Sequence, residues 1–309
     1  ADAETLTEEW IADYVPRYEK SHYYQEIERA EASSKKIPTP NIMQKNALKN
    51  LRDFRSAGKD RALIVSATGT GKTYLSAFDV RDFGPKRVLF LVHRDKILSD
   101  AMYSFKRVLG IDINVGKLTG SRKDFEADYL FATTQSMALE NNLLKFDPHH
   151  FDYIVCDEAH HSSAKQYQTI INHFKPKFLL GMTATPERTD AKEVFSIFDY
   201  NIACEIRLKD ACYVGMVCPF HYFGITDITV DGKLLEEDTD FNALTSDERV
   251  NHIMEEAKYY GYSGSRIRGL IFCSSVKECY SLSEMLNKRG FRTVALSGKS
   301  SDEERESLR

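Results

Sequence analysis

Short apolar runs that alternate with helical segments most constrain the fold of this 309-residue chain. Each run has the length of one β-strand and lacks the polar alternation of a strand with one face in water. The runs are Arg61–Ser66, Arg87–Val92, Tyr129–Thr133, Tyr153–Cys156 and Phe178–Met182. Such strands, separated by helices, predict a doubly wound α/β domain with a parallel sheet covered on both faces. Domains of this class bind ligands at the carboxyl ends of their strands.

The same pattern divides the chain into three parts. Residues 1–38 are highly charged and predict a helical N-terminal segment, while residues 39–208 form the α/β domain. The strand–helix alternation loosens after that and resumes late in residues 209–309. There we expect strands at Gly269–Cys273 and Arg292–Leu296 with a helix between them, as in a linker followed by part of a second domain.

Composition excludes several classes of protein. Apolar residues make up 42% of the chain and charged residues 28%, which is ordinary for a globular protein in water. No run approaches the ~20 apolar residues of a membrane span. The six cysteines include no C-x-x-C pair, so we expect reduced thiols in a cytoplasmic protein rather than a zinc site. The net charge of −4 argues only weakly against nucleic acid, because backbone contacts need only a local basic surface.

A phosphate-binding loop follows the first of these strands, at Ser66–Thr73, and precedes a helix. Glycines let backbone N–H groups wrap phosphates, and the helix N-terminus favours negative charge. We expect Lys72 to reach the β- and γ-phosphates of ATP and the Thr73 hydroxyl to ligate Mg²⁺. Ser66 stands where the strict pattern has glycine. The remaining nucleotide-binding candidates in the loop are Thr68, Gly69, Thr70 and Gly71.

An acidic pair closes the fourth apolar run. The sequence Asp157-Glu158-Ala159-His160 follows Tyr153–Cys156 directly. Two carboxylates at one strand end repel each other, and a bound cation relieves that repulsion. We therefore expect Asp157 to hold Mg²⁺ through water and Glu158 to position or deprotonate the attacking water.

The order of three motifs resembles superfamily 2 helicases and translocases: the phosphate loop, the DEAH sequence, and Thr183-Ala184-Thr185-Pro186 after a further strand. The resemblance implies an ATP hydrolase built from RecA-like domains, with ATP and Mg²⁺ at its site. It also implies that Thr183 and Thr185 couple hydrolysis to movement. We expect His160 to link this motif to the DEAH sequence by a hydrogen bond; a purely structural histidine is the alternative.

Gln44 matches the glutamine with which that superfamily reads adenine. Its neighbours Asn41 and Met43 differ from the arginine and aromatic residue usual there. A plain surface glutamine is the alternative interpretation.

The resemblance further assigns residues to the nucleic acid. Arg94 lies in a motif after the second strand, Thr134 and Gln135 in a Thr/Gln motif after the third, and Ser274 in the motif that opens a second RecA-like domain. Such side chains contact phosphates without reading bases. Helix capping is the alternative role for the hydroxyls.

The closest resemblance within the superfamily is to the bacterial motor subunits of type I and III restriction enzymes, carried by His93-Arg94-Asp95 and Thr185–Asp190. It implies double-stranded DNA as the partner, and a nuclease domain or subunit in the full-length protein. No Gln/Arg motif that would supply arginine fingers follows Ser297, so we expect a fragment with weak turnover. Two alternatives stay open: an RNA helicase, and a fragment that binds ATP or nucleic acid with negligible turnover.

Overall fold

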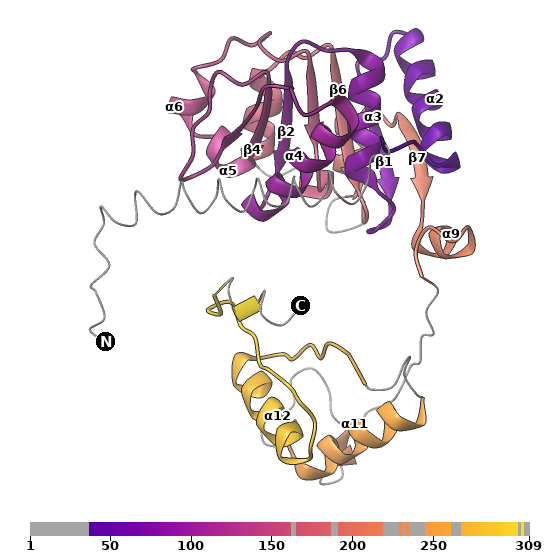
Figure 1. Ribbon diagram of the computed structural model, residues 1–309, viewed down its shortest axis with the longest axis vertical. Helices are drawn as coiled ribbons and strands as arrows, with labels where there is room; N and C mark the ends of the chain where they lie inside the picture. The colour runs from indigo at the N-terminus through magenta and orange to yellow at the C-terminus, as the bar shows by residue number, and fades with distance from the viewer. Residues whose placement is uncertain are drawn as a thin grey trace. The chain divides into compact units, whose positions relative to one another are not determined.

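The computed structural model divides into two compact units, Ala1–Pro219 and Phe220–Arg309 (Figure 1). The described residues are 37–161, 165–186, 191–218, 229–230, 233–234, 245–260, 267–301 and 304–305. The helical segment expected within residues 1–38 therefore lies almost entirely outside the described residues. No helix among the described residues is long and apolar enough to cross a membrane.

A seven-stranded sheet forms the centre of the first unit (Figure 1). Its strands are β1 (Arg61–Ser66), β2 (Val88–Val92), β3 (Val115–Leu118), β4 (Tyr129–Thr133), β5 (Tyr153–Cys156), β6 (Phe178–Thr183) and β7 (Ile202–Ile206). All neighbouring strands are parallel, in the order β3-β4-β2-β5-β6-β1-β7. The predicted doubly wound parallel sheet is thereby confirmed, with two outer strands, β3 and β7, that the sequence pattern did not predict.

Each inner strand sends alternate side chains to two separate apolar cores. In β1, Ile64 belongs to one core, while Leu63 and Val65 belong to the other. The first core is closed by α2 (Ile42–Ser56), α3 (Lys72–Phe83) and α4 (Asp95–Leu109). The second is closed by α5 (Thr134–Met137), α6 (Glu140–Leu143), α7 (Lys165–His173) and α8 (Ala191–Ile197). Both faces of the sheet are buried, which is why its inner strands are continuously apolar.

The strand order brings distant motifs to one edge of the sheet. β5, β6 and β1 are consecutive neighbours in the sheet, although three other strands separate β1 from β5 in the chain. Because all three strands run in the same direction, the segments that follow them emerge side by side at the carboxyl edge. These segments carry the phosphate loop, the DEAH sequence and the Thr-Ala-Thr motif.

A buried polar network ties α2, α3 and β5 together. The Arg55 guanidinium forms two hydrogen bonds with the Asp79 carboxylate, at 2.7 and 2.8 Å. The Tyr153 hydroxyl donates to the same carboxylate at 2.5 Å. Asp79 is fully buried, and Arg55 also lies over the rings of Phe83 and Phe178. The bidentate geometry and the third donor satisfy a charge that would otherwise be costly to bury.

The second unit contains a small two-helix core and a short hairpin. The helices are α11 (Asp247–Tyr259) and α12 (Val276–Lys288), and β8 (Thr229–Val230) pairs antiparallel with β9 (Lys233–Leu234). Val250, Leu282 and Leu286 are the buried apolar residues of this core.

The two strands predicted in this unit do not form. Residues 267–273 and 291–297 have no regular secondary structure, so the expected strands Gly269–Cys273 and Arg292–Leu296 are wrong for this structure. Leu270 and Phe272 are 85% and 92% exposed. A strand needs a hydrogen-bonded neighbour, and among the described residues neither segment has one.

We predict that Asp79→Ala lowers the free energy of unfolding by about 3–5 kcal/mol, because it leaves the buried Arg55 charge and the Tyr153 hydroxyl without their acceptor. Urea denaturation followed by circular dichroism measures the change. Asp82→Ala is the matched control on the same helix, since its contact with Arg81 is at 4.0 Å and partly solvated. That control should cost less than about 1 kcal/mol; equal losses for both variants would contradict the assigned role of the network.

Candidate functional site

The phosphate loop adopts a conformation that requires glycine at two positions. Gly69 and Gly71 both have φ of 82°, in the left-handed region that side chains with a Cβ adopt at a cost. Gly71 is the N-cap of α3 and has no side chain to satisfy the first N–H groups of the helix. The N–H groups in the first turn of a helix favour an anion, so the local backbone is suited to bind phosphate.

Lys72 is held close to the loop backbone. Its ammonium donates to the carbonyl oxygens of Ser66 at 3.0 Å and Ala67 at 3.3 Å. Burial lowers the pKa of Lys72, while the charges of Asp157 and Glu158 act to raise it. The Lys72 ammonium and both carboxylates therefore lie near enough for their charges to interact, as is expected of groups in a single site.

Ser66 takes part in the loop through its hydroxyl. The Ser66 and Thr70 hydroxyl oxygens are 2.6 Å apart, and the Thr70 hydroxyl donates to the Ala67 carbonyl at 2.7 Å. Because Thr70 has a single hydroxyl proton, Ser66 is the donor in the contact between them. The serine that replaces glycine thus closes a short hydrogen-bond chain inside the loop, and both residues are buried.

Asp157 is fixed at the end of β5 by three hydrogen bonds. Its N–H donates to the Leu91 carbonyl at 2.9 Å, and its own carbonyl accepts from the Tyr167 hydroxyl at 2.9 Å. Its carboxylate accepts from the Glu158 N–H at 3.0 Å. Glu158 has φ of 52°, a left-handed conformation that non-glycine residues rarely adopt and that is common at functional sites.

The two acidic residues differ in environment. Asp157 is 6% exposed, and burial raises its pKa to about 6, with the Glu158 charge adding to the rise. The Glu158 N–H and the Lys72 charge oppose this shift. The Glu158 side chain is 32% exposed and reaches solvent, where a water molecule can meet it.

The expected hydrogen bond between the DEAH sequence and the Thr-Ala-Thr motif is confirmed. The Nδ1 of His160, in the short helix η1 (Ala159–His161), lies 3.0 Å from the Thr183 hydroxyl oxygen. The same nitrogen is 3.3 Å from a carboxylate oxygen of Glu158. The Thr183 hydroxyl also accepts from the Thr185 N–H at 3.2 Å. One contact chain therefore connects Glu158 to the start of the segment after β6.

The oxygen atoms at this edge suit Mg²⁺. No group of three or more His, Cys, Asp or Glu side chains among the described residues could hold a metal by itself. Mg²⁺ keeps several waters and is commonly held by one or two protein oxygens together with substrate phosphates. The buried Asp157 carboxylate and the Thr73 hydroxyl would supply these one or two protein oxygens.

Gln44 is a buried residue, so the surface-glutamine alternative is wrong. It is 6% exposed and lies in the first turn of α2. Its amide nitrogen donates to the Gly71 carbonyl at 3.2 Å, and its amide oxygen accepts from the Asn41 N–H at 2.9 Å. The structure thus joins Gln44 to the phosphate loop, 27 positions along the chain.

The nucleic-acid candidates of the first unit divide into two groups. Arg94 and Gln135 are exposed and follow β2 and β4, which are neighbours in the sheet. Thr134, in contrast, is 1% exposed and its hydroxyl donates to the Val92 carbonyl at 2.8 Å. The expected phosphate contact of the Thr134 hydroxyl is therefore corrected to a structural bond that joins the two strand ends.

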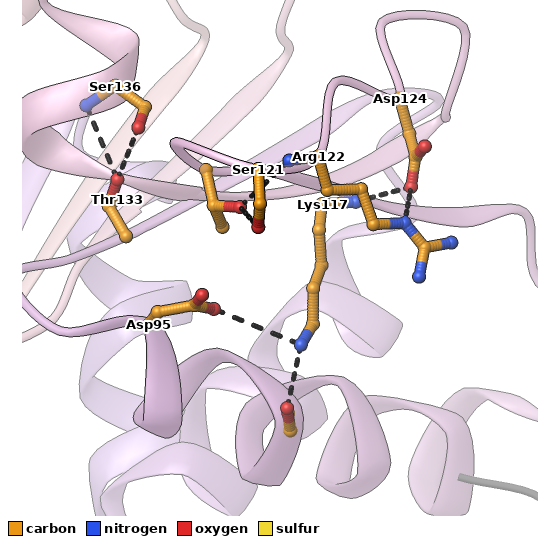
Figure 2. Close-up of polar contacts among 9 residues, drawn as sticks. Asp95, Lys117, Ser121, Arg122, Asp124, Thr133 and Ser136 are labelled. Carbon is orange, nitrogen blue, oxygen red and sulfur yellow. Dashed lines mark hydrogen bonds and ion pairs between the residues drawn. The ribbon is translucent and has the colours of Figure 1, made fainter. Parts of the chain in front are cut away.

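Basic residues that the sequence pattern missed lie at the same edge. Figure 2 shows Lys117, at the end of β3, reaching Asp95, and Arg122 beside Asp124. The Lys117 ammonium is 3.9 Å from Asp95, and the Arg122 Nε donates to Asp124 at 2.7 Å. Arg122 is exposed. The only sequence signal was the short alternation in Val115–Leu118, which is too weak to predict a strand.

The segment after β7 covers the phosphate loop. The Ala67 N–H donates to the Ile206 carbonyl at 2.9 Å, and α9 (Leu208–Tyr213) follows. Val217 lies so close to Gly69 that a Cβ there would be 3.3 Å from its side chain. This contact was not predicted, because it depends on β7 lying beside β1.

Ser274 lies in the second unit, where its hydrogen bonds go to the first turn of α12. Its hydroxyl and its N–H both donate to the buried Glu278 carboxylate at 2.8 Å, and Arg249 lies 3.3 Å from the same group.

Comparison with known proteins identifies relatives among restriction enzymes and helicases. The type I restriction enzyme EcoAI endonuclease subunit of Escherichia coli is 28% identical over 227 residues, covering 69% of this chain and 27% of that protein. A Schizosaccharomyces pombe protein named as a mitochondrial ATP-dependent helicase, irc3, is 27% identical over 269 residues, covering 81% and 43%. The DNA 3'-5' translocase XPB2 of Sulfurisphaera tokodaii is 27% identical over 177 residues, covering 54% and 37%.

The chain thus spans less than half the length of each of these relatives. Residues 37–188 match the ResIII family, the res subunit of type III restriction enzymes, and they contain the phosphate loop, the DEAH sequence and the Thr-Ala-Thr motif. This chain is therefore similar to restriction-enzyme subunits and to ATP-dependent helicases.

Proposed function

We propose that this chain is the ATP-hydrolysing part of a cytoplasmic motor that moves along double-stranded DNA. The proposal rests on the parallel neighbours β5, β6 and β1, which bring the Ser66–Thr73 loop and the Asp157–Glu158 pair to the same edge of the sheet. A phosphate-binding loop beside a carboxylate pair is the arrangement that hydrolysis of a nucleoside triphosphate requires.

In the proposed reaction the Glu158 carboxylate accepts a proton from a water molecule as that water attacks the γ-phosphorus. The bond from this phosphorus to the bridging oxygen of the β-phosphate breaks, and ADP leaves. Lys72 donates hydrogen bonds to the β- and γ-phosphate oxygens and stabilises the charge that builds there. Bound Mg²⁺, held through Asp157 and Thr73, would neutralise further phosphate charge.

The coupling proposal rests on the contact chain from Glu158 through His160 to Thr183. A change of charge at Glu158, or loss of the γ-phosphate near it, alters the hydrogen bonding of His160. That change reaches the Thr183 hydroxyl and the Thr185 N–H directly. We propose that the segment after β6 receives the hydrolysis signal in this way.

The nucleic-acid surface is proposed at the carboxyl ends of β2, β4 and β3. Arg94, Gln135 and Arg122 are exposed there, and the parallel pairing of the three strands supports one continuous strip. Arginine contacts with phosphates supply affinity without sequence preference, as a motor requires. The restriction-enzyme relative and the DNA translocase favour DNA over RNA.

We predict that Lys72→Ala lowers DNA-stimulated ATP hydrolysis by about 10²–10³-fold, because the principal donor to the transferred phosphate is lost. The full-length protein is assayed by phosphate release with and without duplex DNA. Lys59→Ala, an exposed lysine at the opposite end of β1, serves as the control and should keep the rate. An unchanged rate in Lys72→Ala would rule out this site, and stimulation by duplex RNA alone would assign the motor to RNA.

We predict that Arg94→Ala weakens duplex DNA binding equally for unrelated sequences and lowers the slope of log Kd against log salt by about 0.9, the value for one phosphate contact. Fluorescence anisotropy at several salt concentrations measures both quantities. Lys86→Ala is the control, since Lys86 is exposed but precedes β2 at the other edge of the sheet. A slope that matches wild type in Arg94→Ala would remove Arg94 from the interface.

We predict that Asp157→Asn stabilises the Mg²⁺-free protein near pH 7.5 by about 2–3 kcal/mol while it abolishes hydrolysis. The Asp157 pKa of about 6 lies above its ordinary value of 3.8, so ionisation costs folding free energy above pH 6. That cost shrinks as pH falls through 6 and is absent below the ordinary value. Urea denaturation at pH 7.5 and pH 4 tests this, and a stability advantage that grows toward low pH would contradict it.

A further inference from the structure

The peptide group that joins Asp157 to Glu158 is held at both of its polar atoms. Its carbonyl oxygen accepts a hydrogen bond from the Tyr167 hydroxyl at 2.9 Å, and its N–H donates to the Asp157 carboxylate at 3.0 Å. The carbonyl and the N–H belong to one rigid plane, so each bond constrains the other. Tyr167 therefore helps to set the orientation of the plane that connects the two carboxylates.

This orientation has a conformational cost at Glu158. Its φ of 52° lies in the left-handed region, which a residue with a Cβ adopts at the expense of free energy. Rotation of the peptide plane by about half a turn would return this φ to negative values and relieve the cost. The same rotation would turn the carbonyl away from the Tyr167 hydroxyl and the N–H away from the Asp157 carboxylate. The bond from Tyr167 therefore opposes the relaxation.

The Tyr167 hydroxyl is placed by a buried ring. Tyr167 is 1% exposed and lies on α7, within the second apolar core of the first unit. Burial raises the pKa of its hydroxyl, although the Thr134 hydroxyl opposes the rise, so the group keeps the proton that it donates. A buried hydroxyl needs an acceptor, and the Asp157 carbonyl supplies one.

We propose that Tyr167 is a positioning residue for the acidic pair: its hydroxyl holds the Asp157–Glu158 peptide, and so keeps Glu158 in the conformation from which its carboxylate meets the attacking water. This inference rests on the proposed hydrolysis of ATP. Tyr167 acts through the peptide group and not by direct contact with the substrate.

Tyr167→Phe removes the hydroxyl and keeps the ring in the core. We expect kcat of DNA-stimulated ATP hydrolysis by the full-length protein to fall about 10-fold or more, because Glu158 is then displaced from the attacking water. The affinity for a non-hydrolysable ATP analogue with Mg²⁺ should stay within about 2-fold of wild type, since the phosphate loop is unchanged. A kcat equal to that of wild type, or a loss confined to KM, would overturn the proposal.

Hydrogen exchange at the Glu158 amide gives a readout that does not depend on turnover. In wild type the bond to the Asp157 carboxylate should slow this exchange by at least about 10-fold relative to an unstructured amide. Tyr167→Phe should exchange faster, because the peptide is then free to rotate. Mass spectrometry that resolves single amides measures both rates on the nucleotide-free protein. Equal rates would overturn the proposal, and so would an unprotected Glu158 amide in wild type, which decides even if Tyr167→Phe fails to fold.

Tyr153→Phe is the matched control. Tyr153 is also a fully buried tyrosine, at the opposite end of β5 from Asp157, and its hydroxyl donates to the Asp79 carboxylate. Because that acceptor is charged, the control should lower the thermal unfolding temperature at least as much as Tyr167→Phe does. It should leave kcat and the Glu158 exchange rate unchanged. A matching loss of kcat in Tyr153→Phe would assign the effect to destabilisation alone and overturn the proposal.

Hydrolysis by the wild type separates this inference from the proposed function. If the wild type hydrolyses no ATP in the presence of DNA, the proposed function fails, while the exchange rates still decide whether Tyr167 holds the Asp157–Glu158 peptide. If the wild type and Tyr167→Phe hydrolyse ATP equally fast, the positioning role alone fails.

Discussion

The burial of charge at the carboxyl edge of the parallel sheet is the constraint on which the rest of the site depends. Asp157 and Glu158 follow one another at the end of a fully buried strand, and Lys72 is the cation whose pKa responds to both. Burying the charges of two neighbouring carboxylates costs free energy unless an opposite charge lies nearby. The β5-β6-β1 neighbourhood supplies the compensation, because it sets the phosphate loop beside the acidic pair. The same parallel pairing that buries both faces of the sheet therefore also assembles the chemistry.

Hydrogen bonds among α2, α3 and β5 support this edge of the sheet. The fully buried Asp79 joins α2 and α3 to β5 through Arg55 and Tyr153. At the opposite end of α2, Gln44 contacts the loop through Gly71. Catalytic groups work when they are held in place before the substrate arrives, and here the supporting bonds come from a helix that carries no acidic or phosphate-binding motif. α2 therefore supports the phosphate loop through the hydrogen bond from Gln44 to Gly71.

The inner part of the fold could be predicted from sequence because buried parallel strands are continuously apolar. β1, β2, β4, β5 and β6 were all predicted. β3 and β7 were missed because they are the outermost strands, half exposed and with mixed composition. The phosphate loop and the DEAH sequence are contiguous in the chain and so are visible in it. Lys117, Thr134 and the Gly71 contact of Gln44 depend on residues far apart in sequence, which no local pattern reveals. The strands predicted in the second unit failed for a related reason, since apolar runs form strands only beside a hydrogen-bonding neighbour.

We propose that the phosphate loop and the carboxylate pair form one site for a triphosphate and Mg²⁺. The most direct test of this proposal is titration calorimetry of this 309-residue chain with a non-hydrolysable ATP analogue, with and without Mg²⁺. We expect one binding site whose affinity falls by at least about tenfold when Mg²⁺ is removed, because Lys72 alone then offsets the charges of the phosphates, Asp157 and Glu158. Binding of equal strength in the absence of Mg²⁺, or no binding at all, would contradict the proposal.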